Sequence, residues 1–205
     1  MLLIFYYIQY VNGPPIITEH PKDILSRRNE PATLNCASPN ADKFKWYRNG
    51  ELVLTDDSKE QRIITYGGSL FFMRVMANRK ENDAGTYWCV ASNKYGSTKS
   101  SNATLTIASL GNIFIKEPKA SVKVRQGESL VLQCRPPKGV PGPTVLWKHN
   151  GITVLNNSRV WTTKEGDLTF DDVVEADAGV YVCVANNYVG PRESSQSSVV
   201  VMSNL

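Results

Sequence analysis

One pattern occurs twice in the chain and constrains the fold more than any other feature. It is Asp-Ala-Gly-x-Tyr-x-Cys, found at residues 83–89 and again at residues 177–183. In a two-sheet β-sandwich, a tyrosine two residues before an inward-pointing cysteine packs at one end, where its hydroxyl bonds to nearby backbone. The cysteine then pairs with a second cysteine on the facing sheet. The two copies therefore predict an all-β chain of two sandwiches in tandem.

The length of the chain agrees with this division, because its 205 residues leave room for two sandwiches of about 100 residues each. We place the first domain at residues 14–108 and the second at residues 109–205. Residues 1–13 precede the folded part and are largely apolar, but this segment is too short to span a bilayer. We interpret it as part of a signal peptide or as the start of an incorrect gene model.

The four cysteines predict one disulfide in each domain, Cys36–Cys89 and Cys134–Cys183. A metal site is not expected, because the chain has no Cys-x-x-Cys and neither histidine lies near a cysteine in the sequence. Disulfides of this kind indicate an oxidising, extracellular compartment. In the chain-entropy model, closing a loop of roughly 50 residues stabilises a domain by about 4 kcal/mol.

Alternation of apolar and polar residues predicts the same order of strands in both domains. Trp46 lies on the third strand of the first domain, where it is expected to pack on the disulfide. We also expect an ion pair at the base of each sandwich, Arg62–Asp83 in the first and Arg159–Asp177 in the second. The predicted strands are Ile16–His20, Ala32–Cys36, Lys43–Arg48, Glu51–Leu54, Ser69–Val75, Thr86–Ser92 and Thr98–Ile107, then Leu130–Cys134, Asp167–Val173, Gly179–Asn186 and Ser195–Met202.

The two domains differ on the outward face of one strand. In Ser69–Val75 the outward positions hold Phe71 and Met73, whereas the second domain has Thr169 and Asp171 there. Polar residues are usual at a solvent-facing strand position, so two large apolar side chains need a reason. One explanation is that single exposed hydrophobes are common, or that a loop covers them.

The other explanation is a ligand-binding patch on this face of the first domain. The neighbouring strand would place Thr33 and Asn35 beside the apolar pair, and the first strand would add Glu19. An apolar centre with a polar rim is how protein interfaces are usually built.

A basic loop follows the same strand and carries Arg74, Arg79 and Lys80. It is either an ordinary solvated loop or a site for a polyanion such as a sulfated glycosaminoglycan. The net charge of +4, from 23 basic and 19 acidic residues, is too mild for a nucleic-acid-binding protein but allows a local basic patch of this kind.

Two segments fit the acceptor rule for N-glycosylation, at Asn102, expected on the last strand of the first domain, and at Asn156. Enzymatic chemistry has no support in the sequence. The two histidines, His20 and His149, fall in different domains without a companion nucleophile, and the cysteines are committed to disulfides. We therefore expect no catalytic residues and no cofactor.

Several motifs beyond this general pattern resemble the first two immunoglobulin domains of Roundabout receptors, the axon-guidance receptors for Slit. The Pro-Pro-basic-Gly segment at residues 136–139 is the most diagnostic, because immunoglobulin domains in general do not require it. The resemblance extends from about Pro15 to Val201. The other segments that carry it are Glu19–Pro21, Glu30–Cys36, Gly68–Phe72, Pro143–Thr144 with Trp147, and Asn187–Gly190.

The resemblance implies two I-set immunoglobulin-like domains, of which the first binds the concave face of a Slit leucine-rich-repeat domain. Heparan sulfate would assist by bridging basic residues of both partners. One departure is Ala37, which stands where some relatives have a basic residue, and it bears on ligand strength and identity rather than on the fold. The family's contact positions fall on Glu19, Asn35, Phe71 and Met73 for Slit, and on Arg79 and Lys80, with Arg74 nearby, for heparan sulfate.

The expected function is therefore ligand recognition at the cell surface. The chain would be part of the ectodomain of a single-pass membrane receptor, or a secreted protein if it is complete. The alternative is an immunoglobulin-superfamily adhesion protein with homophilic or heterophilic contacts, which self-association of the chain would favour. A third interpretation, a structural spacer without a specific ligand, leaves Phe71 and Met73 unexplained.

Overall fold

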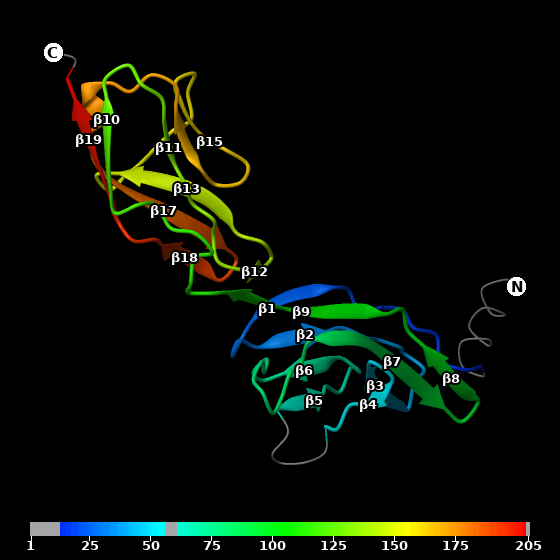
Figure 1. Cartoon of the computed structure of the whole chain (residues 1–205). Coiled ribbons are helices and arrows are strands. Elements are labelled where there is room, and N and C mark those ends of the chain that lie inside the picture. Colours follow the sequence, from blue (N-terminus) through cyan, green and yellow to red (C-terminus); the bar gives the residue numbers. More distant parts are fainter. Residues whose placement is uncertain (1–12, 56–60, 204–205) are drawn as a thin grey trace, which may run out of the picture. The chain divides into compact units, whose positions relative to one another are not determined.

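A computed structural model of the chain describes residues 13–55 and 61–203. The predicted apolar N-terminal segment lies outside the described residues, apart from Gly13. The described part divides into two compact units between Ile107 and Ala108 (Figure 1). Each unit has its own buried core and its own disulfide, so the prediction of an all-β chain with two sandwiches is confirmed.

The first unit is built from two sheets. One has the order β2-β6-β5, and the other has the order β1-β9-β7-β3-β4 with β8 beside β7 (Figure 1). The strands are β1 (Ile24–Arg27), β2 (Ala32–Leu34), β3 (Lys43–Arg48), β4 (Glu51–Leu52), β5 (Arg62–Ile64), β6 (Leu70–Phe72), β7 (Gly85–Asn93), β8 (Gly96–Lys99) and β9 (Ala103–Leu110).

The second unit repeats this plan. Its sheets have the orders β11-β16-β15 and β10-β19-β17-β13-β14, with β18 beside β17. The strands are β10 (Ser121–Arg125), β11 (Leu130–Leu132), β12 (Gly139–Val140), β13 (Thr144–His149), β14 (Ile152–Thr153), β15 (Val160–Thr162), β16 (Leu168–Phe170), β17 (Gly179–Asn187), β18 (Gly190–Glu193) and β19 (Ser197–Met202), with one short 3₁₀ turn at Glu175–Asp177. Within the described ranges, no helix has the length and apolar character that a membrane span requires.

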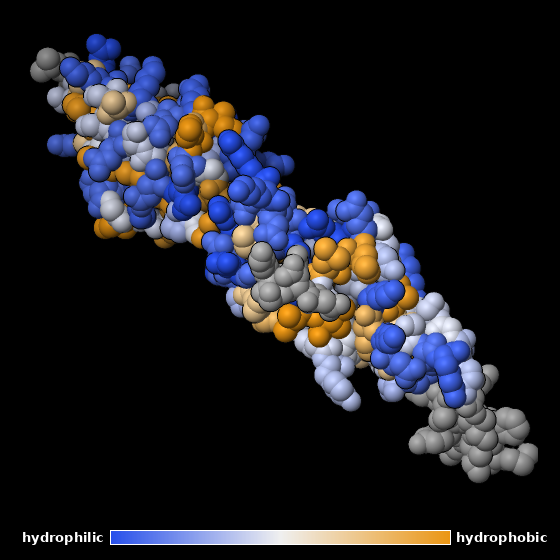
Figure 2. Space-filling view, turned by 90° about the horizontal axis from the view of Figure 1, so that it is seen from below, coloured by the Kyte–Doolittle hydropathy of each residue, from blue (hydrophilic) through white to orange (hydrophobic). Residues whose placement is uncertain are grey.

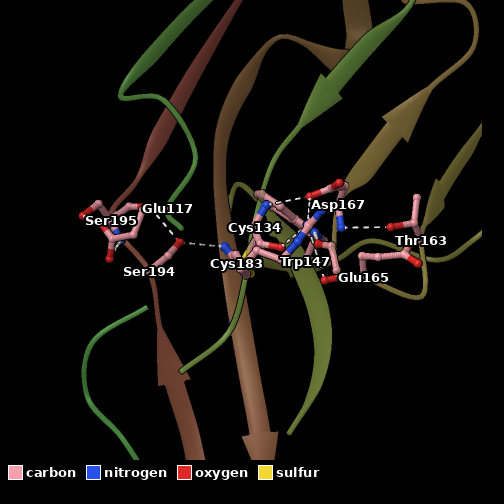
Figure 3. Close-up of a disulfide and its surroundings, with 11 residues drawn as sticks. Glu117, Cys134, Trp147, Thr163, Glu165, Asp167, Cys183, Ser194 and Ser195 are labelled. Carbon is pink, nitrogen blue, oxygen red and sulfur yellow. Dashed lines mark hydrogen bonds and ion pairs between the residues drawn. A yellow bond between two sulfur atoms is a disulfide. The ribbon is translucent and has the colours of Figure 1, made fainter. Parts of the chain in front are cut away.

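A disulfide and a tryptophan form the centre of each core. In the second unit, Cys134, Cys183 and Trp147 are all fully buried, and the indole N–H of Trp147 donates to the carbonyl of Gly166 at 2.9 Å (Figure 3). Asp167 lies beside this group and accepts hydrogen bonds from the backbone N–H of Cys134 and from Arg135. Burial raises the pKa of the Asp167 carboxyl, but the two hydrogen bonds, together with the positive charges of Arg135 and Lys116, hold the pKa below its usual range.

The base of each sandwich has the predicted tyrosine corner and ion pair. The Tyr87 hydroxyl donates to the carbonyl of Asp83 at 2.6 Å, and the same residue's carboxylate accepts from Arg62 at 2.6 Å. The second unit repeats both contacts, with Tyr181 bonded to Asp177 at 2.9 Å and Arg159 to the Asp177 carboxylate at 2.6 Å. The expected ion pairs are therefore confirmed.

The first predicted strand is wrong in extent. Ile16–His20 does not form a strand, and only Glu19 makes an isolated bridge, to Ala37. The chain then passes Pro21, and β1 begins at Ile24 in the opposite sheet. Proline cannot donate to a strand ladder, which suits the point where the chain changes sheets.

The predicted last strand, Thr98–Ile107, is also broken. The structure divides it into β8 and β9, because Ser101 donates its backbone N–H to the ring of His20 at 2.9 Å rather than to a neighbouring strand. The strands predicted around residues 32–36, 51–54 and 69–75 are present but shorter.

The last residue of the long strand of each unit is an asparagine, and its side chain holds the segment that enters the unit. Asn93 donates from its side-chain amide to the carbonyls of Gly13 and Asn40, both at 2.9 Å. Asn187 donates in the same way to Ser109 and Pro141, both at 2.8 Å. In both units, the entering segment is therefore held by hydrogen bonds from the side-chain amide of the asparagine at the same strand position.

Candidate ligand-binding surface

The candidate surface is the outer face of the β2-β6-β5 sheet in the first unit. In β6, Leu70 and Phe72 are fully buried, so Phe71 between them points outward and is half-buried. Phe71 stands opposite Thr33 of β2 and opposite Ile63 of β5, whose side chain is 43% exposed. Cross-strand neighbours contact each other, so these three side chains form one row across the sheet.

Met73 extends this row along the strand direction. It lies just beyond the end of β6, where its backbone N–H donates to the carbonyl of Gln61 at 2.8 Å and continues the ladder. Its side chain is 48% exposed. Because successive residues of a strand alternate between faces, Phe71 and Met73 lie on the same face, as the sequence predicts.

The polar end of the surface is formed by Glu19 and Asn35. The Asn35 side-chain amide donates to the Glu19 carboxylate at 2.9 Å, and both residues are exposed. Glu19 is held in place by backbone hydrogen bonds with Ala37. From Asn35 to Met73, the face extends about 13 Å along the strands, at about 3.3 Å per residue.

Sequence reasoning missed Ile63. The alternation within β5 contains the signal, because Arg62 turns inward to pair with the buried Asp83, and the next residue must therefore point outward. Ile63 widens the apolar centre from one strand to two.

The corresponding face of the second unit differs mainly on its central strand. Thr169 takes the place of Phe71, between Val131 and Trp161. Asp171, the counterpart of Met73, is exposed. The central residue is thus flanked by one apolar side chain, Ile63, in the first unit and by two, Val131 and Trp161, in the second. The first unit differs in that the centre itself, on β6, is apolar.

Exposed apolar side chains are visible in patches among hydrophilic ones on the surface of the first unit (Figure 2). The exposed large apolar residues of the candidate surface are Ile63 and Met73, and the half-buried Phe71 lies between Ile63 and Thr33. This combination is an apolar centre with a hydrogen-bonded polar rim, which suits binding of a protein surface.

The basic residues lie next to this surface, on the loop after β6. The loop closes through a bridge between Ala77 and Asn82, and the side-chain oxygen of Asn78 accepts the backbone N–H groups of Lys80 and Glu81, both at 2.9 Å. Arg74, Arg79 and Lys80 are all exposed.

The acidic neighbour of these cations in the sequence does not neutralise them. Glu81 turns towards Arg62, at 3.3 Å. Among the described residues, no acidic group forms an ion pair with Arg74, Arg79 or Lys80. The loop therefore presents positive charge to solvent beside the apolar face.

The two glycosylation acceptors are both exposed. Asn102 was expected on the last strand of the first domain, but it lies in the break between β8 and β9. Asn156 lies in the loop between β14 and β15, and its side-chain oxygen accepts the backbone N–H of Thr162 at 2.9 Å.

Comparison with known proteins gives one family and a consistent group of relatives. The profile of the immunoglobulin domain family matches residues 14–93 and 113–187. Roundabout homolog 1 of Homo sapiens is 41% identical over 194 residues, which cover 92% of this chain and 12% of that protein. Protein sax-3 of Caenorhabditis elegans is 41% identical over 199 residues, which cover 93% of this chain and 15% of that protein.

Among solved structures, an I-band fragment of titin, I67–I69, has a TM-score of 0.75 at 24% identity, covering 93% of this chain and 66% of that one. This likeness shows the fold alone. The sequence matches confirm the predicted resemblance to Roundabout proteins, and the chain spans only 12% to 15% of the length of the relatives quoted above.

Proposed function

We propose, from the premise that this chain belongs to the immunoglobulin domain family, that it is the ligand-binding part of a Roundabout-like guidance receptor. Its first unit binds the leucine-rich-repeat domain of a Slit-like protein. The contact residues are Glu19, Asn35, Phe71 and Met73, with Ile63 added to the apolar centre. The role is recognition, without catalysis, and the family match confirms the expectation that the chain is not an enzyme.

The observation that carries this proposal is the outward row of apolar side chains on one sheet of the first unit. Phe71 is flanked by Ile63 and Thr33, and Met73 follows on the same face. Apolar anchors at the centre of an interface supply most of its binding free energy. The hydrogen-bonded pair of Glu19 and Asn35 supports the register of the partner at the rim.

Heparan sulfate is proposed as a second partner. The exposed charges of Arg74, Arg79 and Lys80 lie on the loop that directly follows the apolar face. A sulfated chain bound there can reach basic residues of the protein ligand as well, which raises the effective affinity. Extracellular exposure of both units is part of the proposal and agrees with their two disulfides.

The test is binding of the secreted two-unit chain to a Slit leucine-rich-repeat domain by surface plasmon resonance. We expect Phe71→Asp to weaken binding by at least about 30-fold, because loss of a central anchor costs about 2 kcal/mol or more. The matched control is Thr169→Asp, which places the same charge at the corresponding position of the second unit and should leave binding unchanged.

Both variants must retain two disulfides and the wild-type circular dichroism spectrum. Absence of wild-type binding, or equal binding by Phe71→Asp and wild type, would overturn the site. Concentration-dependent self-association of the wild-type chain in the same measurements would favour the adhesion alternative.

A further inference from the structure

The two sheets of the second unit have open edges on the same side. β14 is the last strand of one sheet and β15 is the last strand of the other. A groove of about 550 Å³ lies at this edge, with Val154, Val160 and Phe170 among its apolar lining residues. The corresponding groove of the first unit measures only about 180 Å³.

The rim of this groove is unusually apolar for a solvent-facing edge. Ile152 on β14 is 76% exposed, and Leu155 in the following loop is 78% exposed. An unpaired strand edge beside exposed apolar side chains is a template for association with another chain. Such an edge is expected to be covered in the native protein.

The acceptor asparagine of the second unit lies on this rim. Asn156 is exposed, and its two chain neighbours, Leu155 and Asn157, both line the groove. The Asn157 side chain fixes the loop by accepting the backbone N–H groups of Arg159 and Val160, at 2.9 and 2.8 Å. Ser158 completes the acceptor motif and is exposed.

The Asn156 side chain is held in an orientation that leaves its amide nitrogen available. Its oxygen accepts the backbone N–H of Thr162, on the free edge of β15. Within the described part of the chain, no residue is seen to accept a hydrogen bond from its nitrogen. Attachment of a sugar to that nitrogen keeps the carbonyl oxygen and so keeps the bond to β15.

We propose that Asn156 carries an N-linked glycan that covers the open edge and the apolar groove of the second unit. The donor is an oligosaccharide linked to a lipid diphosphate. The amide nitrogen forms a bond to the anomeric carbon as the bond from that carbon to the diphosphate oxygen breaks. The diphosphate leaves with the bonding electron pair, and the amide loses one proton. A glycan is bulky and hydrophilic, so it shields the edge from other chains.

The first unit has no acceptor in the matching loop, since residues 55–61 contain no asparagine. Its groove is also the smaller of the two. The matching edge of the first unit also exposes apolar side chains, Leu52 and Leu54, so the second unit is distinguished by its larger groove and by the acceptor beside it. This proposal is independent of the ligand-binding surface, which belongs to the first unit.

The test compares the full chain with Ser158→Ala and Ser158→Thr, each secreted from a cultured eukaryotic cell line. Glycan removal by an amidase in heavy-oxygen water marks each glycosylated asparagine as a heavy aspartate in the peptide mass spectrum. We expect the mark at Asn156 in the wild type and in Ser158→Thr, and its loss in Ser158→Ala. An unmarked Asn156 in the wild type would overturn the site.

The covering role is tested by sedimentation velocity on the same proteins. Wild type and Ser158→Thr should remain monomeric, whereas Ser158→Ala should shift to larger species as concentration rises. Enzymatic removal of glycans from the folded wild type should have the same effect, which separates covering from any folding defect of the variant. The matched control, Thr104→Ala, removes the Asn102 acceptor and should sediment as the wild type does.

Adding Ile152→Ser and Leu155→Ser to Ser158→Ala should restore the monomer, because these changes remove the apolar rim. Equal sedimentation of wild type and Ser158→Ala at every concentration would overturn the covering role, even with Asn156 glycosylated.

Discussion

Asp83 is the buried charge on which the base of the first unit depends. Its side chain is fully buried, and it accepts from Arg62, whose side chain is 11% exposed, and from the backbone N–H of Met76 at 2.6 Å. We expect Asp83→Asn to destabilise the first unit by about 3 kcal/mol, because the guanidinium of Arg62 loses its buried carboxylate and keeps only the more distant and partly exposed Glu81. Calorimetry of the first unit's transition measures this loss.

The second unit supplies the matched comparison. Arg159, the partner of Asp177, has a side chain that is 33% exposed, so water can compensate part of its charge. Asp177→Asn should therefore cost less than Asp83→Asn. A larger effect in the second unit would contradict this ranking.

The two corner tyrosines make stability sensitive to alkali. Burial, and then the charge of Asp83, raise the pKa of Tyr87 to about 12, and burial and Asp177 move the pKa of Tyr181 in the same direction. An unfolded tyrosine has a pKa of about 10. Above that pH the unfolded chain loses protons that the folded chain retains, so stability falls as pH rises from about 10 to about 12.

The measurement is the thermal midpoint as a function of pH, with Tyr87→Phe beside the wild type. The variant loses the hydroxyl bond to Asp83 and should start from a lower midpoint, but its decline above pH 10 should be shallower. Parallel declines of the two proteins would show that Tyr87 does not contribute.

At the scale of one element, the loop after β6 should control polyanion binding. We expect Arg79→Ala with Lys80→Ala to weaken binding to immobilised heparin and to reduce the dependence of binding on salt, because fewer counterions are displaced. The matched control is Lys119→Ala with Lys123→Ala, two exposed cations of the second unit. Equal losses in both double variants would indicate non-specific attraction.

Most strands follow from the alternation of residues, and the exceptions have physical causes. β1 was missed because its pattern is inverted, with Ser26 buried and Leu25 38% exposed. The break between β8 and β9 depends on the ring of His20, a contact between residues 81 positions apart that no local pattern contains. Phe71 was placed correctly because Leu70 and Phe72 on either side are strongly apolar.

The candidate surface was only partly predictable for a similar reason. Phe71 and Met73 follow from one strand, whereas Ile63 becomes part of the surface only through the register of β5 against β6. The bond between Glu19 and Asn35 depends on the bridge at Ala37, which formed although the predicted first strand did not.

At the scale of the whole molecule, each unit should respond separately to loss of its disulfide. The cores are distinct, and the bonded cysteines are 53 and 49 residues apart in the sequence. Replacing Cys134 and Cys183 by alanine should destabilise the second unit by about 4 kcal/mol. Calorimetry should show one lowered transition and one unchanged transition, whereas an equal shift of both would indicate that the units unfold together.

The asparagine that ends the long strand of each unit has a consequence for how chains of such units lengthen by duplication. Asn93 and Asn187 each fasten the segment that leads into their own unit, through bonds to residues of that same unit. The residues that position the entering segment of a unit are thus all encoded within the sequence of that unit. A duplicated copy can be inserted into a longer array without needing hydrogen bonds from the preceding copy.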